Sequence, residues 1–376
     1  MKITCPRSNL LEAVNTVQRA ISSKTTMPIL ECIKLETVDN SHVLVTGTNI
    51  DLFIEYNLKC EVIEGGTVAL ESKMFGEIVR KMPEDNVLIE VQDSNDVTKI
   101  ECGRSKFSIR GQNPTGYPQS PTIEEQFSLT IEESDLKKII RKALPFIAIN
   151  EGKRPVLTGA LFDIKGKQLT VVTTDSHRIA AIKEELDDST GDAKIVVPGQ
   201  TLRELLKILH DEGSVKLIAG DRKLLFEFKN FKLVTRLLEG EFLRYEAIIS
   251  AVNPISMKIE KKTLMNSLER AILLINDDVS SSTDNKVPVR LSLGYDKLDI
   301  SCMTGKGQVQ DTISADIDGG ELEIGFNCRF LLDAMGVCDD EEIKIEFSAP
   351  TSGCFIKANS EEQSYVYMIL PVRLYN

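Results

Sequence analysis

The chain has 376 residues, of which 42% are hydrophobic and 27% charged, and its net charge is −12. This length favours two or three globular domains, each able to bury its own core. The opening MKITCPRSNLLEAV lacks the apolar run of a secretory leader, and no uncharged apolar run approaches the roughly 18 to 20 residues that cross a bilayer. We therefore expect a cytoplasmic protein without a membrane span.

The inventory of side chains for chemistry is small. There are eight Cys without a C-x-x-C pair, three His and no Trp. The cysteines are scattered through apolar or strand-like segments, so we expect reduced, mostly buried thiols and no metal site. The sequence has no phosphate-binding loop, zinc-protease motif or nucleophile elbow. It therefore predicts no cofactor and no catalytic residues.

The same pattern of elements recurs three times along the chain. Each copy has a helical pattern of apolar residues, a strand that follows a proline, and a more polar strand; the prolines are Pro28, Pro155 and Pro288. The spacing between these prolines is too long for a solenoid repeat and suits a whole domain. The chain is therefore predicted to consist of three copies of one domain, with boundaries at 1–125, 126–252 and 253–376.

A second helix follows an extended segment in the latter half of each copy. In the second copy, Thr201 and Glu204 have the spacing of a capping box. Alternating runs such as 86–91 and 342–347 indicate half-buried strands around the helices. We therefore expect an α+β fold in which each domain has two helices packed on antiparallel sheets.

Charge is distributed unevenly between the helices and the rest of the chain. The six predicted helices hold 14 Lys and Arg against 6 Asp and Glu, a balance of +8, over residues 8–20, 72–82, 134–146, 199–210, 261–275 and 328–337. Since the whole chain carries −12, the remainder carries −20. One basic helix face can simply be solvated, but basic helices against an acidic background indicate a surface that faces a polyanion.

The segment TDSHRIA (174–180) is the one that most resembles a catalytic site. Asp175, Ser176 and His177 are the residue types of a hydrolytic triad. Adjacent residues on a strand point to alternate faces, however, whereas triad members meet through the fold. A hydrolase is therefore the less favoured interpretation, and His177 and Arg178 can equally be surface residues at the end of a strand.

The last segment, SYVYMILPVRLYN (364–376), is apolar to within a few residues of its end. Chain ends fray unless they are held. The segment is expected to form either a last core strand or one wall of an exposed apolar groove, and the alternating faces of a strand allow both.

Eight short segments, taken in order, carry a family resemblance. They are MKI at the start, SKTTMPIL (23–30), TGTNIDL (46–52), LTGALFD (157–163), TDSHRIA, LLEGEFLRY (237–245), EIGFN (323–327) and ILPVRL (369–374). Together they resemble the bacterial DNA polymerase III beta subunits, the replicative sliding clamps. The resemblance implies three repeated clamp domains assembled as a head-to-tail homodimeric ring around duplex DNA. It also implies a processivity factor that tethers the replicative polymerase and has no chemistry of its own.

Partners of that family insert short linear motifs into a cleft between the second and third domains. The partners implied are the DNA polymerase III alpha subunit, the clamp loader, other polymerases and repair proteins. Carried over by position, the cleft residues are Leu157, Thr174, Ser176, His177, Arg178, Ile179, Leu243, Ile248, Met368, Leu370, Pro371, Val372 and Arg373. The family often has Gly at Ser176, Pro at Leu243 and Met at Val372, so we expect an altered peptide preference.

A ring that holds DNA topologically needs only sequence-independent contacts to phosphate, which let a protein slide. The candidates are Lys24, Lys73, Arg80, Lys81, Lys137, Lys138, Arg141, Lys142, Arg154, Arg203, Lys207 and Arg270. Pairing the edge strands of the first and third domains between two copies would close the ring. Two alternatives stay open. One is a paralogous clamp in repair or antibiotic resistance, and the other is a sequence-specific DNA-binding protein.

Overall fold

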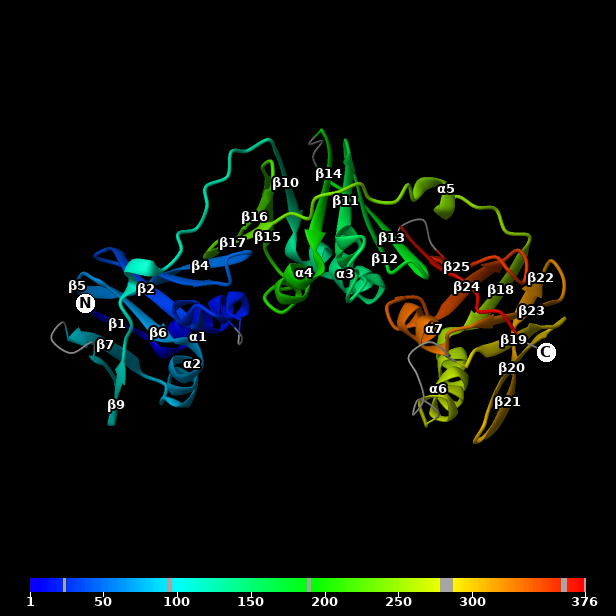
Figure 1. Ribbon diagram of the computed structural model, residues 1–376, viewed down its shortest axis with the longest axis horizontal. Helices are drawn as coiled ribbons and strands as arrows, with labels where there is room; N and C mark the ends of the chain where they lie inside the picture. The colour runs from blue at the N-terminus through cyan, green and yellow to red at the C-terminus, as the bar shows by residue number, and fades with distance from the viewer. Residues whose placement is uncertain (23–24, 93–96, 188–190, 278–286, 360–363, 375–376) are drawn as a thin grey trace. The chain divides into compact units, whose positions relative to one another are not determined.

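The structure is a computed structural model and describes the chain except residues 23–24, 93–96, 188–190, 278–286, 360–363 and 375–376. The helices stand between runs of antiparallel strands, which confirms the predicted α+β class (Figure 1). The helices are α1 Arg7–Val17, α2 Ser72–Lys81, α3 Glu133–Ala143, α4 Gly199–Leu206, α5 Glu246–Ile249, α6 Lys261–Asp277 and α7 Cys328–Met335. None of the described helices has the length and apolar character needed to span a membrane.

The first of two compact units comprises Met1–Asp135 and Gln200–Leu237. It contains a five-stranded sheet, β5-β1-β7-β8-β9, and an eight-stranded sheet, β10-β15-β16-β17-β4-β3-β2-β6. The strands are β1 Lys2–Pro6, β2 Cys32–Asp39, β3 His42–Thr48, β4 Leu52–Lys59, β5 Glu61–Glu64, β6 Thr67–Glu71, β7 Asn86–Gln92, β8 Val97–Cys102, β9 Ser105–Arg110, β10 Phe127–Glu132, β15 Ser214–Ala219, β16 Lys223–Glu227 and β17 Phe231–Arg236. Because β4 pairs with β17, one sheet is shared by the first and second sequence repeats.

The second unit comprises Leu136–Gly199 and Leu238–Asn376. Its nine-stranded sheet has the order β14-β11-β12-β13-β26-β25-β24-β18-β22, and its four-stranded sheet the order β21-β20-β19-β23. The strands are β11 Gly159–Lys165, β12 Gln168–Thr174, β13 Arg178–Glu185, β14 Asp192–Pro198, β18 Ile255–Glu260, β19 Val289–Leu293, β20 Lys297–Thr304, β21 Gly307–Ser314, β22 Asp316–Asp318, β23 Leu322–Phe326, β24 Glu342–Phe347, β25 Cys354–Lys357 and β26 Ser364–Ile369. Strand β13 pairs with β26, so the second and third repeats also share a sheet.

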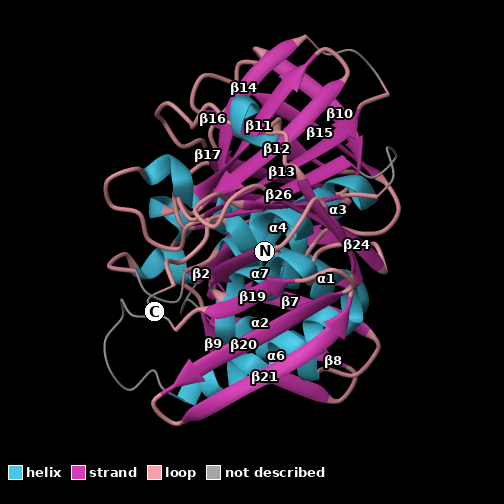
Figure 2. Ribbon diagram, turned by 90° about the vertical axis from the view of Figure 1, so that its right-hand side faces the viewer, coloured by secondary structure: helices cyan, strands magenta, loops and turns pink. Residues whose placement is uncertain are grey.

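Helices cover one face of these sheets. Helix α1 packs against β1, β3 and β4, and α6 packs against β20 and β21. Figure 2 shows the four-stranded sheet with α6 behind it. In the nine-stranded sheet, the Thr173 hydroxyl donates to the Ala143 carbonyl at the end of α3, so α3 lies on the face to which Thr173 points. The neighbouring Val172 points to the opposite face, where it packs with Leu161, Ile179 and Tyr245.

Two details of the helices differ from the sequence predictions. The capping box at Thr201 is wrong, because α4 begins at Gly199 and the Thr201 hydroxyl lies 2.7 Å from Thr235 Oγ1 in the interior. Helix α5 was not predicted, because a helix of four residues shows no apolar period. Caps do form elsewhere, where the side chains of Glu71 and Asn327 accept hydrogen bonds from the first amides of α2 and α7.

The cores contain the cysteines and the last strand. All eight Cys are free and buried, which confirms the expected buried thiols. Burial raises the pKa of Cys5, and separately that of Cys354, to about 12, so these thiols are protonated at neutral pH. In β26, Tyr365, Tyr367 and Ile369 are buried, as expected of a core strand. The described residues contain no group of three or more His, Cys, Asp or Glu placed to hold a metal ion.

Candidate functional sites

The basic residues of the helices lie mainly on the faces that point away from the cores. In α3, Leu136, Ile139 and Ile140 are buried, whereas Lys138 and Arg141 are exposed. The exposed cations of the predicted set on helices are Lys73, Arg80, Lys81, Lys138, Arg141 and Arg270, and Lys207 is exposed in the turn that follows α4. Lys137 and Arg203 are half-buried, and Lys24 lies outside the described residues. These helices therefore present positive charge to solvent while their apolar faces hold the sheets.

Several of these cations are already paired with carboxylates. Arg80 Nη1 lies 2.6 Å from Glu77 Oε1, and Lys207 Nζ lies 2.9 Å from Glu204 Oε1. Arg141 is 2.5 Å from Asp339 Oδ1, and Arg270 bonds to Asp311. The hydrogen bond from Arg270 lowers the pKa of Asp311, so that carboxylate stays ionised beside its cation. Paired cations attract phosphate less strongly than free ones, so the field of these helices is weaker than their number of bases indicates.

Two further members of the predicted set, Lys142 and Arg154, are held by contacts of their own. Lys142 is buried, with Nζ 2.8 Å from Asp339 Oδ2 and 5.1 Å from the centroid of the Tyr365 ring. Its position is wrong for a phosphate contact, because the ammonium group is held inside the second unit. Arg154 donates a hydrogen bond from Nη2 to the Ser176 hydroxyl at 3.0 Å. The structure therefore places Arg154 with the TDSHRIA turn and not with the basic helices.

The TDSHRIA segment forms a tight turn between β12 and β13. The Thr174 hydroxyl accepts from the amide of Ser176 at 3.1 Å, and Asp175 Oδ1 accepts from the amides of His177 and Arg178, both at 3.0 Å. Ser176 has a φ of 73°, a left-handed conformation that glycine adopts at less cost. The glycine that the resemblance led us to expect here would therefore adopt this turn at less cost than Ser176 does.

The guanidinium group of Arg178 makes three hydrogen bonds within the second unit. Its Nε donates to Asp175 Oδ2 at 2.9 Å, its Nη1 to Asp333 Oδ2 at 2.8 Å and its Nη2 to the Pro145 carbonyl at 2.6 Å. The guanidinium carbon also lies 4.2 Å from the centroid of the Phe330 ring. Both oxygens of Asp175 are thus engaged by Arg178 and the backbone, so a triad of Asp175, Ser176 and His177 is not formed.

Apolar residues of the linker at 238–249 cover the sheet face opposite to α3. Leu161, Val172, Ile179, Ala181 and Val196 form a cluster with Tyr245, and Leu238, Phe242, Ile248, Ile249 and Met368 pack against it. We call this set the linker cluster. Phe242 also packs on Ala148, Val156 and Leu157. The structure therefore brings together Leu157, Ile179, Ile248 and Met368, four of the residues predicted to bind partner peptides.

The TDSHRIA turn and the end of β26 adjoin each other. The amide of Leu370 donates to the His177 carbonyl at 2.9 Å, and Ile179 lies opposite Met368 in the β13–β26 pair. Leu370 is 40% exposed and His177 is exposed, so both can meet a ligand. Thr174 is buried in the turn and serves its geometry, whereas Pro371 is half-buried.

Two residues of this surface were missed from the sequence. Phe242 joins both apolar clusters, whereas its predicted neighbour Leu243 is 39% exposed. Phe330 of α7 lies with its ring centroid 6.2 Å from that of His177. The LLEGEFLRY segment was the available signal for Phe242, but a linker has no period that tells which of two adjacent apolar residues faces the sheet.

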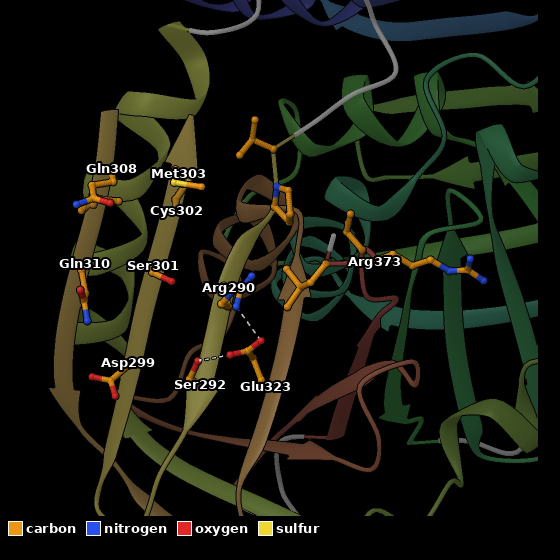
Figure 3. A pocket seen from close by; sticks show the side chains of 15 residues that line it. Arg290, Ser292, Asp299, Ser301, Cys302, Met303, Gln308, Gln310, Glu323 and Arg373 are labelled. Atoms are coloured by element: carbon orange, nitrogen blue, oxygen red, sulfur yellow. Dashed lines mark hydrogen bonds and ion pairs between the residues drawn. The ribbon is translucent and has the colours of Figure 1, made fainter. Parts of the chain in front are cut away.

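Val372 and Arg373 lie along the four-stranded sheet. The Val372 amide donates to the Gly325 carbonyl at 2.8 Å, and both residues line a cavity of about 1000 Å³ with the polar face of β19, β20, β21 and β23. In Figure 3, Arg290, Ser292 and Glu323 point toward one another, while Arg373 extends away from them. These two residues are therefore not part of the linker cluster.

Comparisons with known proteins agree over the whole chain. Models of the DNA polymerase III beta subunit match its N-terminal domain at residues 1–121, its central domain at 130–243 and its C-terminal domain at 248–373. Relatives named beta sliding clamp, from Halalkalibacterium halodurans and Bacillus subtilis, are 35% and 33% identical over all of both chains.

Solved structures give the same result. A putative DNA polymerase III beta subunit from Eubacterium rectale has a TM-score of 0.92 and 34% identity, and the Bacillus subtilis sliding clamp has 0.91 and 31%; each covers both chains completely. A sliding clamp from Pseudomonas aeruginosa, solved bound to griselimycin, has a TM-score of 0.91 at 23% identity, again with full coverage of both chains.

Proposed function

The chain belongs to the DNA polymerase III beta subunit family, the bacterial sliding clamps, and from this premise we propose which of its surfaces hold DNA, a second copy and partner proteins. The protein is a DNA sliding clamp, a processivity factor and not an enzyme, and its partners include DNA and a polymerase. Relatives named beta sliding clamp favour this function over a paralogous role in repair or antibiotic resistance. We propose a cytoplasmic protein with domains at 1–125, 126–252 and 253–376. The matched ranges support three domains in this order, and the third matched range begins at residue 248, five residues before the proposed boundary.

The DNA-facing surface is proposed to be the exposed faces of α2, α3, α4 and α6. The supporting observation is that Lys73, Lys81 and Lys138 are exposed opposite the buried faces of their helices. Contacts to phosphate alone carry no sequence information. The carboxylates beside Arg80, Arg141, Lys207 and Arg270 reduce the attraction further. A weak, uniform attraction suits a protein that must move along the duplex.

Closure with a second copy is proposed to occur between β9 and β21. These are the last strands of the five-stranded and four-stranded sheets. Edge strands expose unpaired amides and carbonyls, which a strand of another chain can satisfy. The two sheets shared by sequence repeats supply a template for this pairing, because each joins the last strands of two three-stranded runs. In one sheet β17 of β15–β17 pairs with β4 of β2–β4, and in the other β26 of β24–β26 pairs with β13 of β11–β13.

The template fixes a register. Three rows of residues paired across three neighbouring strands occupy equivalent positions in the repeats, and their first residues are equally spaced along the chain. The rows are Ile89–Ile100–Phe107, Leu217–Phe226–Leu233 and Ile345–Ile356–Tyr367. Leu233 lies opposite Ile54, and Tyr367 lies opposite Ala180. Ile54 pairs with Gly47 in the first repeat, and Ala180 pairs with Thr173 in the second. The equivalent pair in the third repeat is Val309 with Cys302, so Val309 corresponds to Ile54 and Ala180. We therefore propose that Phe107 of one copy lies opposite Val309 of the other.

Partner peptides are proposed to bind at the linker cluster and the adjoining TDSHRIA turn. Phe242, Ile248 and Met368 are partly exposed there, and Leu370 and His177 lie beside them. An apolar surface with a few exposed polar groups suits a short linear motif. We propose that the clamp loader, other polymerases and repair proteins use this surface, and that griselimycin binds to it.

Retention on nicked circular DNA, in the presence of a loader and ATP, tests the clamp function. A topologically linked ring is retained on the circle and lost when the circle is cut to a linear form. Equal retention on both forms would instead indicate a contact-based DNA-binding protein.

A further inference from the structure

A tyrosine fastens the linker to the sheet. Tyr245 precedes α5 and is 4% exposed. Its ring packs in the linker cluster, and its hydroxyl donates to Asp163 Oδ2 at 2.8 Å. Burial and the neighbouring Asp163 raise the pKa of Tyr245, so the hydroxyl is a protonated donor at neutral pH. Tyr245 therefore stands where an apolar part of the sheet face meets a polar one.

The acceptor of this bond is itself deeply buried. Asp163 on β11 is 2% exposed, and its Oδ2 lies 3.1 Å from Lys194 Nζ and 3.4 Å from Lys165 Nζ. Both ammonium groups also lie 3.7 Å from Glu246 Oε1, on the residue after Tyr245. The linker is thus attached to β11 and β14 by one hydrogen bond and a shared group of charges.

The same stretch of chain supplies part of the proposed peptide-binding surface. Phe242 precedes Tyr245 by three residues, and Ile248 follows it by three. The amides of Ile248 and Ile249 both donate to the Tyr245 carbonyl, at 3.0 and 3.1 Å. A displacement of Tyr245 would therefore move Ile248 through the backbone of α5 and loosen Phe242 on the other side.

We propose that Tyr245 is a positioning residue for partner binding: its hydrogen bond to Asp163 holds Phe242 and Ile248 in the arrangement that a ligand meets. This inference rests on the proposed peptide-binding surface. It adds that the affinity of that surface depends on a buried bond which the ligand does not touch.

The linker between β9 and β10, residues 111–126, contains a tyrosine that can be compared with Tyr245. Tyr117, which occupies the equivalent position one repeat before Tyr245, is 5% exposed and packs on Cys32 and Ala69 in the first unit. Its hydroxyl lies 3.0 Å from the carbonyls of Cys32 and Thr46. Three residues before and after Tyr117, however, stand Pro114 and Ser120 in place of Phe242 and Ile248. Tyr117 therefore anchors a linker in the same way but holds no apolar pair for a ligand.

The test compares Tyr245→Phe with Tyr117→Phe in the full-length protein, using calorimetric titration with griselimycin. We expect Tyr245→Phe to weaken binding about tenfold, the size of one hydrogen bond to a charged group. Tyr117→Phe should leave the affinity unchanged, although the two substitutions should lower the melting temperature of the protein by similar amounts. Hydrogen exchange should accelerate at the amides of Ile248 and Ile249 in Tyr245→Phe alone.

Each other outcome has a distinct meaning. Unchanged affinity in Tyr245→Phe overturns this inference and leaves the surface assignment standing. Equal weakening by both substitutions also overturns it, since general destabilisation would then be the cause. Absence of binding to the unsubstituted protein overturns the surface assignment and the inference together. A double-mutant cycle with Asp163→Leu, which removes the acceptor, adds a check. If the two residues act through one bond, the double variant binds griselimycin no more weakly than the weaker-binding of the two single variants.

Discussion

Replacing Phe107 with Ala should separate the ring into single chains at concentrations where the unsubstituted protein is a dimer. Phe107 stands on the edge strand β9 and is 39% exposed in the single chain. In the register that we propose from the shared sheets, it lies opposite Val309 of the second copy. Burial against that strand would remove its remaining exposed area from water.

The magnitude follows from this area. A Phe side chain buries about 200 Å², so the exposed part is about 80 Å² and its burial contributes about 2 kcal/mol at about 25 cal/mol per Å². A closed ring of two copies contains this contact twice, which gives about 4 kcal/mol, or a change of about 10³-fold in the dimer dissociation constant. Sedimentation equilibrium over a range of concentrations measures this constant directly.

Ile63 provides the matched control. It lies on β5, the opposite edge of the same five-stranded sheet, and is 55% exposed. Ile63→Ala removes a similar apolar area from an edge that is not proposed to pair. A dimer weakened by Ile63→Ala but not by Phe107→Ala would show that the wrong edge has been assigned, and the register argument would fail with it.

Two further predictions concern the basic helices and the turns. Changing Lys138 and Arg141 to Ala should reduce retention on circular DNA and lower the slope of log affinity against log salt by about 1 for each cation; the exposed strand and loop residues Lys59 and Lys229 serve as controls, and an equal effect from them would refute the assigned face. Ser176→Gly should raise stability by about 0.5 to 1 kcal/mol, because Ser176 has a φ of 73°, and Ile50→Gly should do the same in the equivalent turn, where φ is 81°. Thermal unfolding measures both, and a loss of stability in either variant would contradict the strain argument.

The repeated architecture could be read from the sequence because its signals are periodic. The apolar residues of α3 recur at helical spacing, and Leu136, Ile139 and Ile140 are buried as that spacing requires. The same spacing put Lys142 on the polar face. It is buried because Asp339 and Tyr365, which belong to the third sequence repeat, pack beside it. Periodicity describes one helix and carries no information on what covers its end.

The partner surface was harder to predict for a related reason. The residue patterns singled out TDSHRIA and the C-terminal segment, but only the family resemblance joined them in one peptide-binding cleft. Phe242, Phe330 and Tyr245 instead act through contacts between distant strands and helices. Arg154 illustrates the difficulty: its charge suggested DNA, but its hydrogen bond is to Ser176. Net charge and residue type cannot distinguish these roles without the turn that brings Arg154 and Ser176 together.

The composition of the shared sheets bears on where a ring of this kind opens. Inside the chain, β17 meets β4 through Leu233 with Ile54 and Val234 with Phe53, and the rings of Tyr56 and Phe231 stack at 6.2 Å. In the proposed pairing between copies, Phe107 with Val309 is flanked by Lys106 with Gln310 and Ser108 with Gln308. When this row separates, it loses less apolar contact than the pairing of β17 with β4 would lose. If a loader opens the ring, we therefore expect the proposed pairing of β9 with β21 to separate first, while the sheets shared by repeats within each chain stay intact.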